Sequence, residues 1–367
     1  MQSEPASTPA STLAKDAPSH SRRLLALLTV GIAMLIALVV GELFVRWLLP
    51  QPVMSPRAQF SEAYGLIAFP NRSILSEMPG HWRFTHSTNA LGHRGPLIPL
   101  SNRYPTPNVV VLGDSYTFGY GIDDGQEYPA LLRTALAGRF EVVNLGMGGW
   151  GLTQEIRRFY ELGQLYQPVA VVLQFTGNDP FENLSFPVTR IEQGRFSFHA
   201  APGTLAWVKR LVSDSVIQRS QLYNLLRQQI YWAMATAGRT EGRSGANLPP
   251  RTAAEAASGA APAWATAEEM QLHGDLLALF ARDLTRRGIP LILIGVEGHF
   301  DAMPPLLARV KALDGAGLLR YIDVAHWLNQ AEHANSPEGH WGPPTHRTVA
   351  DGLAKAIDAL GIRPTPP

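Results

Sequence analysis

The sequence predicts an α/β protein with a parallel five-stranded sheet, preceded by one helix that spans a membrane. Three observations support this prediction. Short, Val-rich apolar runs recur from Asn108 onward, helical patterns separate these runs, and an uncharged apolar stretch lies near the N-terminus. Strands that alternate with helices are typical of βαβ units, in which helices cover both faces of a parallel sheet.

The predicted elements follow one another along the chain. The strands are Asn108 to Leu112, Glu141 to Leu145, Val169 to Phe175, Pro290 to Gly295 and Leu319 to Val324. The helices are Pro129 to Leu136, Thr153 to Tyr166, Ala267 to Arg287, Pro304 to Leu313 and Pro344 to Leu360. In the last helix Val349, Leu353 and Ile357 share one face, as expected for a helix that packs on a sheet.

The apolar stretch Leu24 to Gly41 carries no charge and is long enough, as a helix, to cross most of a bilayer core. Lys15, Arg22 and Arg23 precede it, so the positive-inside rule places residues 1–21 in the cytoplasm and the rest of the chain outside, in a periplasmic or extracellular location. We interpret residues 22–49 as an uncleaved signal anchor. A cleaved signal peptide is the alternative, but the apolar run is longer than a usual h-region.

The remaining segments differ in composition. Residues 1–21 are expected to form a disordered tail, and residues 50–107 an irregular juxtamembrane lead-in to the α/β region 108–367. An insertion at about 184–266 interrupts the alternation of strands and helices. Its part from Leu205 to Met234 has a helical pattern, whereas Ala237 to Thr266 has too few large apolar residues to pack and is expected to be disordered. A lid, a membrane-leaning surface, a spacer and a simple extension of the core all remain open for it.

Composition excludes several classes of function. The chain has 31 Lys and Arg against 30 Asp and Glu, so it lacks the basic excess that binds nucleic acid, and no such partner is expected. It contains no cysteine, which excludes disulfides, thiolate metal sites and a cysteine nucleophile.

Chemically useful residues follow the strands, where ligands bind in a parallel sheet. Gly113-Asp114-Ser115 follow the first strand, a glycine-rich run that ends in Gly148-Gly149 follows the second, and Thr176 to Asp179 follow the third. A loop before the last helix, "SPEGHWGPPTH", supplies histidines. Together these positions provide a hydroxyl, a glycine backbone, a carboxamide and an imidazole, which is what acyl transfer requires.

The chain from about Asn108 to Leu360 resembles the SGNH (GDSL-type) hydrolases, a superfamily of esterases, lipases and carbohydrate O-deacetylases. The motifs that carry the resemblance are "GDSYTFG", "NLGMGGWG", "TGND" and "EGHWGPPTH". The resemblance implies a flavodoxin-like three-layer α/β/α sandwich, with Ser115 as the nucleophile and His340 as the general base. It also implies an oxyanion hole formed by the backbone N–H groups of Ser115 and Gly149 and the side chain of Asn178, and no cofactor.

The acid of the catalytic triad departs from the family pattern. The family usually has Asp three residues before the histidine, or two before it in relatives that include alginate O-acetylation proteins. Here Pro337 occupies the first place and Glu338 the second. Glu338 is therefore the predicted residue that orients the imidazole of His340, and a Ser–His dyad is the alternative.

The predicted function is that of a membrane-anchored serine ester hydrolase, acting on acyl or O-acetyl esters of an envelope carbohydrate or a lipid. An O-acyltransferase that uses the same residues and a non-catalytic envelope scaffold are the alternatives, and a flavodoxin-like metal phosphatase is a weaker one. No metal is expected, because Glu338, His340 and His346, with His333, match no HExxH spacing and Pro343-Pro344 interrupt the helix that would align them.

Four further residues have an ambiguous role. His299 in "VEGHF" follows a strand and is interpreted as an ordinary loop histidine, with a base or a substrate contact as the alternative. Arg94 in "LGHRGP" either reaches the site or braces the lead-in. Trp150 is expected to pack against the sheet, with the lining of a sugar or acyl pocket as the alternative. His346 is expected to lie partly exposed in the first turn of the last helix.

Overall fold

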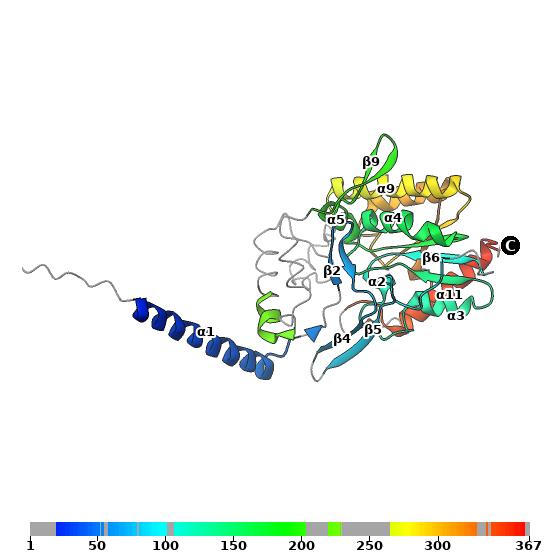
Figure 1. Ribbon diagram of the computed structural model, residues 1–367. Helices are drawn as coiled ribbons and strands as arrows, with labels where there is room; N and C mark the ends of the chain where they lie inside the picture. The colour runs from blue at the N-terminus through cyan, green and yellow to red at the C-terminus, as the bar shows by residue number, and fades with distance from the viewer. Residues whose placement is uncertain are drawn as a thin grey trace, which may run out of the picture. The chain divides into compact units, whose positions relative to one another are not determined.

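The computed structural model of the chain (Figure 1) forms two compact units, Met1–Pro50 and Gln51–Pro367. It describes residues 20–51, 53–54, 58–78, 81–100, 106–202, 219–227, 229, 265–328, 335–336 and 339–363.

The described part of the first unit contains the helix α1 (His20–Leu48). Its part from Arg22 to Leu48 has a mean hydropathy of 2.8, so its length and composition suffice to cross a membrane. Near its end Arg46 forms an ion pair with Glu42, one turn earlier, at 2.8 Å. The predicted tail 1–21 lies outside the described residues except for the first two residues of this helix.

The second unit is built on a parallel five-stranded sheet in the order β12-β11-β8-β6-β7. Its strands are β6 (Asn108–Leu112), β7 (Glu141–Asn144), β8 (Ala170–Phe175), β11 (Leu291–Gly295) and β12 (Arg320–Asp323). Numbered along the chain, the order is 2-1-3-4-5, which is the flavodoxin-like arrangement with its switch point between the first and third strands. The predicted fold class is therefore confirmed, and all five strands lie where the sequence predicts them.

Helices cover both faces of this sheet because successive strand residues point to opposite sides. In β6, Val109 and Val111 pack with the helices α3 (Tyr128–Ala135) and α11 (Pro343–Ala359). Val110 and Leu112 pack instead with α4 (Leu152–Glu161), α9 (Ala267–Arg286) and α10 (Pro304–Gly315). Figure 1 shows α4 and α9 on one side of β6, and α3 and α11 on the other.

Short helical segments complete the domain. They are α2 (Ser115–Phe118), α5 (Asp179–Ser185), and the 3-10 turns η1 (Gly163–Tyr166) and η3 (Val324–His326). The helix predicted over Thr153 to Tyr166 is thus two elements, since α4 ends at Glu161 and η1 follows. Gly163, a poor helix former, lies at this break.

The lead-in is not irregular, which corrects the prediction. It contains β1 (Val53–Met54), β2 (Ala58–Ser61), β3 (Gly65–Ala68), β4 (Ser73–Met78) and β5 (Trp82–Ser87). These strands pair antiparallel, β2 with β3, β1 with β4, and β4 with β5. In the β4–β5 pair the buried positions are Ile74, Ser76, Phe84 and His86. Two of these four are polar, which hides the two-residue period that identifies a half-buried strand.

The insertion begins with a hairpin, β9 (Thr189–Glu192) and β10 (Arg195–Phe198). Of the predicted helix 205–234 the structure describes residues 219–227 and 229, of which 221–227 and 229 are helical. The predicted disordered stretch 237–266 lies outside the described residues apart from Ala265 and Thr266, and Thr266 caps the N-terminus of α9.

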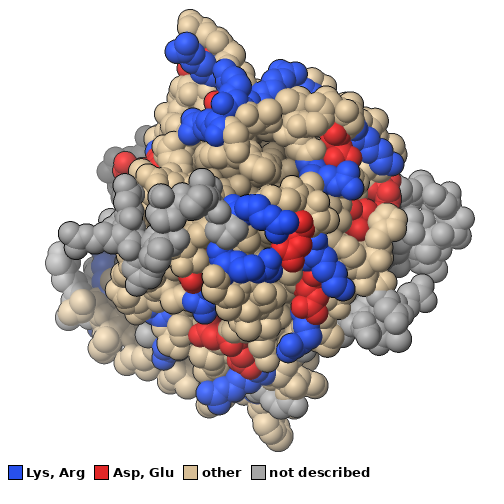
Figure 2. All heavy atoms as spheres, turned by 90° about the vertical axis from the view of Figure 1, so that its right-hand side faces the viewer, with Lys and Arg blue, Asp and Glu red and all other residues tan. Residues whose placement is uncertain are grey.

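Charges on the surface are mixed. The face in Figure 2 shows Lys and Arg side chains interspersed with Asp and Glu rather than gathered in one basic field. This distribution matches the net charge of +1.

Candidate active site

Ser115 begins helix α2 immediately beyond the carboxyl end of β6. Gly113 makes the turn with φ of +151°, and a side chain there would collide with Thr117 and Gln174. Asp114 is the N-cap of α2, and its Oδ1 accepts the backbone N–H of Tyr116 at 3.0 Å. The strand therefore ends so that the hydroxyl of Ser115 projects from the edge of the sheet.

The imidazole of His340 lies next to this hydroxyl. The distance between His340 Nε2 and Ser115 Oγ is 2.9 Å, although the two residues are 225 positions apart in the chain. The ring of His340 also contacts those of Tyr116 and Tyr120, with centroids 4.8 and 5.1 Å away. A histidine at this distance can accept the proton of a serine hydroxyl and make the oxygen nucleophilic.

A tight turn before α11 carries His340. The backbone N–H of Ser336 donates to the carbonyl of His340 at 2.6 Å, and Gly339 N–H donates to the carbonyl of Ser336 at 2.9 Å. Trp341 is fully buried and its indole N–H donates to Glu297 at 2.8 Å, which anchors the turn to the loop after β11. Glu338 lies outside the described residues, so its role as the orienting acid stays a prediction.

The glycine-rich loop after β7 lies against the serine. A Cβ built on Gly148 would be 3.6 Å from Cβ of Ser115, an ordinary van der Waals distance, so the two residues lie next to each other. Gly149 has φ of +78° and has only Leu66 of β3 near its Cβ position, at 3.9 Å. Among the described residues, the backbone N–H groups of Ser115 and Gly149 donate to no protein acceptor. Both are therefore available to a bound group.

Asn178 lies at the start of α5 beyond β8, half-buried, and its carboxamide does not cap that helix. Its loop is held from two sides. Asp179 Oδ2 accepts the N–H of Thr176 at 2.9 Å, and His299 Nδ1 accepts the N–H of Gly177 at 3.0 Å. Burial lowers the pKa of His299 to about 4, so this nitrogen remains an acceptor at neutral pH. His299 thus supports the Asn178 loop, a role that its sequence context does not indicate.

Polar side chains beneath the site connect its strands, and sequence reasoning missed them. Thr117 Oγ1 lies 3.0 Å from Gln174 Oε1 of β8 and 2.8 Å from the hydroxyl of Tyr128. Asn144, the last residue of β7, donates its side-chain N–H to the carbonyl of Thr117 at 3.1 Å. The available signal was a polar residue in an otherwise apolar buried strand, as in "AVVLQF" and "EVVN".

Four buried carboxyl groups lie around α2, α4 and α5: Asp114, Glu155, Asp179 and Glu182. Burial raises the pKa of Asp114 to about 6 and that of Glu182 to about 8, and the carboxylate of Asp114 adds to the shift of Glu182. Burial also raises the pKa values of Glu155 and Asp179 well above their ordinary range. No three His, Asp or Glu side chains in the described part of the chain are placed to share a metal ion.

The structure corrects two other predictions. His346 lies in the first turn of α11 as expected, but it is fully buried rather than partly exposed. Its Nδ1 accepts the N–H of Tyr128 at 3.1 Å, and burial lowers its pKa to about 3. Trp150 is buried, but it packs on the lead-in rather than against the parallel sheet: it stacks on Tyr64 with centroids 5.0 Å apart, and its indole N–H donates to the carbonyl of Leu66 at 2.7 Å.

The five-stranded sheet order and the Ser115–His340 pair are the features expected of an α/β/α protein of the SGNH type. Residues 111–291 match the GDSL-like Lipase/Acylhydrolase family, and this segment is a domain of that family. No protein of curated function is significantly similar to the chain in sequence.

Several solved structures resemble the chain. An esterase from Pseudoalteromonas sp. has 10% identity, covers 69% of this chain and 97% of its own, and superposes with a TM-score of 0.39. A lipase/acylhydrolase from Enterococcus faecalis has 12% identity, coverage of 70% and 97%, and a TM-score of 0.39. A GDSL-like lipase from Bacteroides thetaiotaomicron has 12% identity, coverage of 72% and 93%, and a TM-score of 0.38. At this distance none of them indicates a substrate.

Proposed function

We propose that this protein is a membrane-anchored serine ester hydrolase in which Ser115 is the nucleophile and His340 the general base. The observation that carries the proposal is the 2.9 Å distance between Ser115 Oγ and His340 Nε2. The backbone N–H groups of Ser115 and Gly149 and the side-chain N–H of Asn178 serve as the oxyanion hole. Glu338 is the proposed acid that orients His340.

The reaction follows the chemistry of a serine nucleophile. His340 Nε2 takes the proton of Ser115 as its oxygen bonds to the ester carbonyl carbon. The carbonyl oxygen then carries negative charge, which the three donors stabilise. Collapse of this intermediate breaks the bond to the alcohol, and the alcohol receives the proton from His340.

The second half of the reaction regenerates the serine. His340 takes a proton from water, the resulting hydroxide attacks the acyl group on Ser115, and the acid product leaves while the proton returns to the serine oxygen. A sugar hydroxyl in the place of water would make the enzyme an O-acyltransferase. The same residues serve both reactions, so the acceptor decides between them.

The proposed substrates are acyl or O-acetyl esters of an envelope carbohydrate or a lipid. Leu66, half-buried beside Gly149, offers an apolar contact to the acyl group next to the oxyanion hole. We propose that α1 anchors the enzyme, with Lys15, Arg22 and Arg23 on the cytoplasmic side and the hydrolase domain on the extracytoplasmic side. An anchor raises the effective concentration of the enzyme near either substrate.

Labelling with a fluorophosphonate probe tests the nucleophile. The full-length protein in detergent should be tagged on the peptide that contains Ser115, and Ser115→Ala should abolish both the tag and p-nitrophenyl acetate hydrolysis. Ser197→Ala is a matched control, because Ser197 Oγ also lies 3.0 Å from a histidine, His199, but on the β9–β10 hairpin. Equal hydrolysis by the unaltered protein and Ser115→Ala would favour a non-catalytic scaffold.

The oxyanion hole has its own test. Loss of one donor in such a site costs about 100-fold to 1000-fold in turnover, so Asn178→Ala should lower kcat by this factor and leave KM nearly unchanged. The fold should persist, because the carboxamide does not cap α5. An Asn178→Ala variant with the kcat of the unaltered protein would exclude the carboxamide as a donor.

A further inference from the structure

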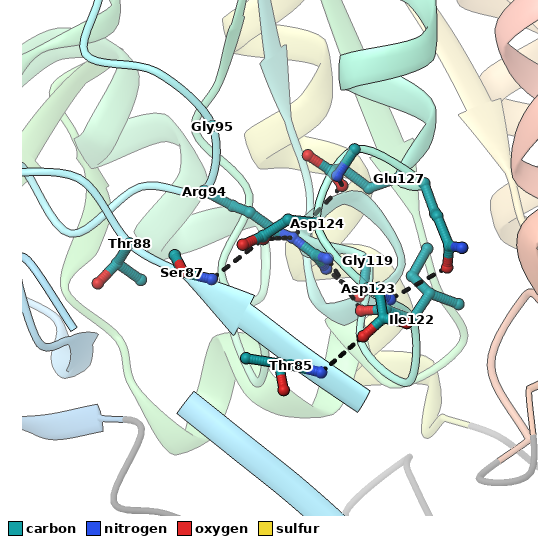
Figure 3. A network of polar contacts seen from close by, with 12 residues as sticks. Thr85, Ser87, Thr88, Arg94, Gly95, Gly119, Ile122, Asp123, Asp124 and Glu127 are labelled. Carbon is teal, nitrogen blue, oxygen red and sulfur yellow. Dashed lines mark hydrogen bonds and ion pairs between the residues drawn. The ribbon is translucent and has the colours of Figure 1, made fainter. Parts of the chain in front are cut away.

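Arg94 connects the lead-in to the loop that follows the nucleophile helix (Figure 3). Its side chain is completely buried. Nη1 donates to the carbonyls of Phe118, at 3.1 Å, and Gly119, and Nη2 donates to the carbonyl of Ile122 at 2.9 Å. Nε lies 3.1 Å from Asp124. One guanidinium thus binds three successive parts of the same loop.

The bonds to Phe118 and Gly119 supply hydrogen-bond donors to the carbonyls at the C-terminal end of α2. The last carbonyls of a helix have no partner within the helix, and α2 is only four residues long. Gly119 ends it with φ of +80°, and a side chain at this position would lie 2.8 Å from Nη1 of Arg94. The opposite end of α2 is Ser115. Arg94 therefore holds the helix whose first residue carries the hydroxyl.

The same clamp fixes Tyr120. This residue lies between the carbonyls that Arg94 binds, and its ring contacts His340 on one side and Phe84 of β5 on another, with centroids 5.1 and 5.6 Å away. Movement of this loop would displace α2, which begins with Ser115, and also the ring of Tyr120, which contacts His340. Arg94 thereby acts on Ser115 and His340 together.

The charge of Arg94 is compensated within the network. Nε lies 3.3 Å from the buried carboxylate of Glu127, and Asp124 is partly exposed. Burial raises the pKa of Glu127, and the charge of Arg94 opposes this rise. A lysine cannot replace the arginine, because its single ammonium group cannot donate to the carbonyls of both Phe118 and Ile122, as the planar guanidinium group does.

We propose that Arg94 is a positioning residue that sets the geometry between Ser115 and His340, which makes the lead-in part of the active site. The inference rests on the proposed function. It concerns a residue outside the matched segment 111–291. A displacement of about 1 Å at reacting atoms can cost roughly 100-fold, so Arg94→Lys should lower kcat about 10-fold to 100-fold and leave KM nearly unchanged.

Asp123→Ala is the matched control. Asp123 accepts the N–H of Thr85 at 2.8 Å and so joins the same loop to β5, but it does not contact the carbonyls of α2. Its kcat should stay within about twofold of the unaltered protein. Titration of active sites with the fluorophosphonate counts the folded enzyme. A purely structural role would reduce the number of titrated sites and leave kcat per site unchanged, which would overturn the inference.

A measurement that needs no ester completes the test. The chain has no cysteine, so Ser115→Cys introduces a single thiol, whose pKa the rate of iodoacetamide alkylation against pH reports. His340 beside it should hold this pKa below the ordinary value of about 8.5. Adding Arg94→Lys should raise the pKa by about one unit, whereas adding Asp123→Ala should not.

The outcomes separate the two proposals. A lowered thiol pKa that Arg94→Lys leaves unchanged overturns the positioning role, and the proposed esterase stands. An ordinary thiol pKa in the Ser115→Cys variant alone overturns the Ser115–His340 pairing, and both proposals fall with it.

Discussion

The buried carboxyl of Glu182 predicts how the stability of the protein depends on pH. Glu182 lies in the first turn of α5, only 7% exposed. Burial, with a contribution from the carboxylate of Asp114, raises its pKa from 4.5 to about 8. The folded chain therefore holds this proton more tightly than the unfolded chain. Its contribution to stability is fully present below pH 4.5 and is lost as the pH rises towards about 8.

The magnitude follows from this one proton. Between the two pKa values, the free energy of unfolding falls by about 1.4 kcal/mol per pH unit. Glu182→Gln is neutral in both states and removes this slope. From about pH 5.5 to about pH 7.5 the variant should gain roughly 3 kcal/mol in stability relative to the unaltered protein.

Denaturant unfolding at a series of pH values, followed by tryptophan fluorescence of the full-length protein in detergent, measures this difference. The comparison isolates Glu182 from the other buried carboxyls because these are present in both proteins. Glu268→Gln, at an exposed position in the first turn of α9, is the control and should parallel the unaltered protein. Parallel pH curves for Glu182→Gln and the unaltered protein would refute the reasoning, since they would mean that Glu182 is ionised in the folded state.

Two further predictions concern the site. Leu66→Trp should lower kcat/KM for long-chain p-nitrophenyl esters more than for the acetate, because Leu66 lies beside Gly149, and an equal change along the series would argue against an acyl contact. His299→Phe keeps an aromatic ring but removes the acceptor of the Gly177 N–H, so kcat should fall about 10-fold with KM little changed. An unaltered kcat would mean that the Asn178 loop needs no such support.

Much of the fold follows from local patterns. The runs that form β6, β8 and β11 are apolar almost throughout, because these central strands are covered on both faces. The edge strand β12 is only partly buried and carries Arg320 and Asp323. The strands of the lead-in carry no such pattern. Their inward positions include the polar residues Ser76 and His86, so no two-residue period marks them.

Part of the candidate site could also be predicted from the sequence. Ser115, Gly149 and Asn178 follow consecutive strands of a parallel sheet, and all carboxyl ends of such strands lie at one edge. This property of parallel sheets identifies the candidate site residues, but it does not identify the residues that hold their loops in place. His299 and Gln174 hold the loops through hydrogen bonds to Gly177 and Thr117, which lie in other parts of the chain, and the local sequence does not indicate such pairs.

The sequence by itself determined which segments become strands and helices and which chemical groups stand at their ends, because propensity and periodicity act over a few residues. Only the tertiary structure decided that a hydroxyl and an imidazole 225 positions apart come within 2.9 Å, and that Arg94 is buried against the nucleophile loop. These contacts depend on the order of strands in the sheet and on how the lead-in packs on it. Both are set by burial summed over the whole domain rather than by any short stretch of chain.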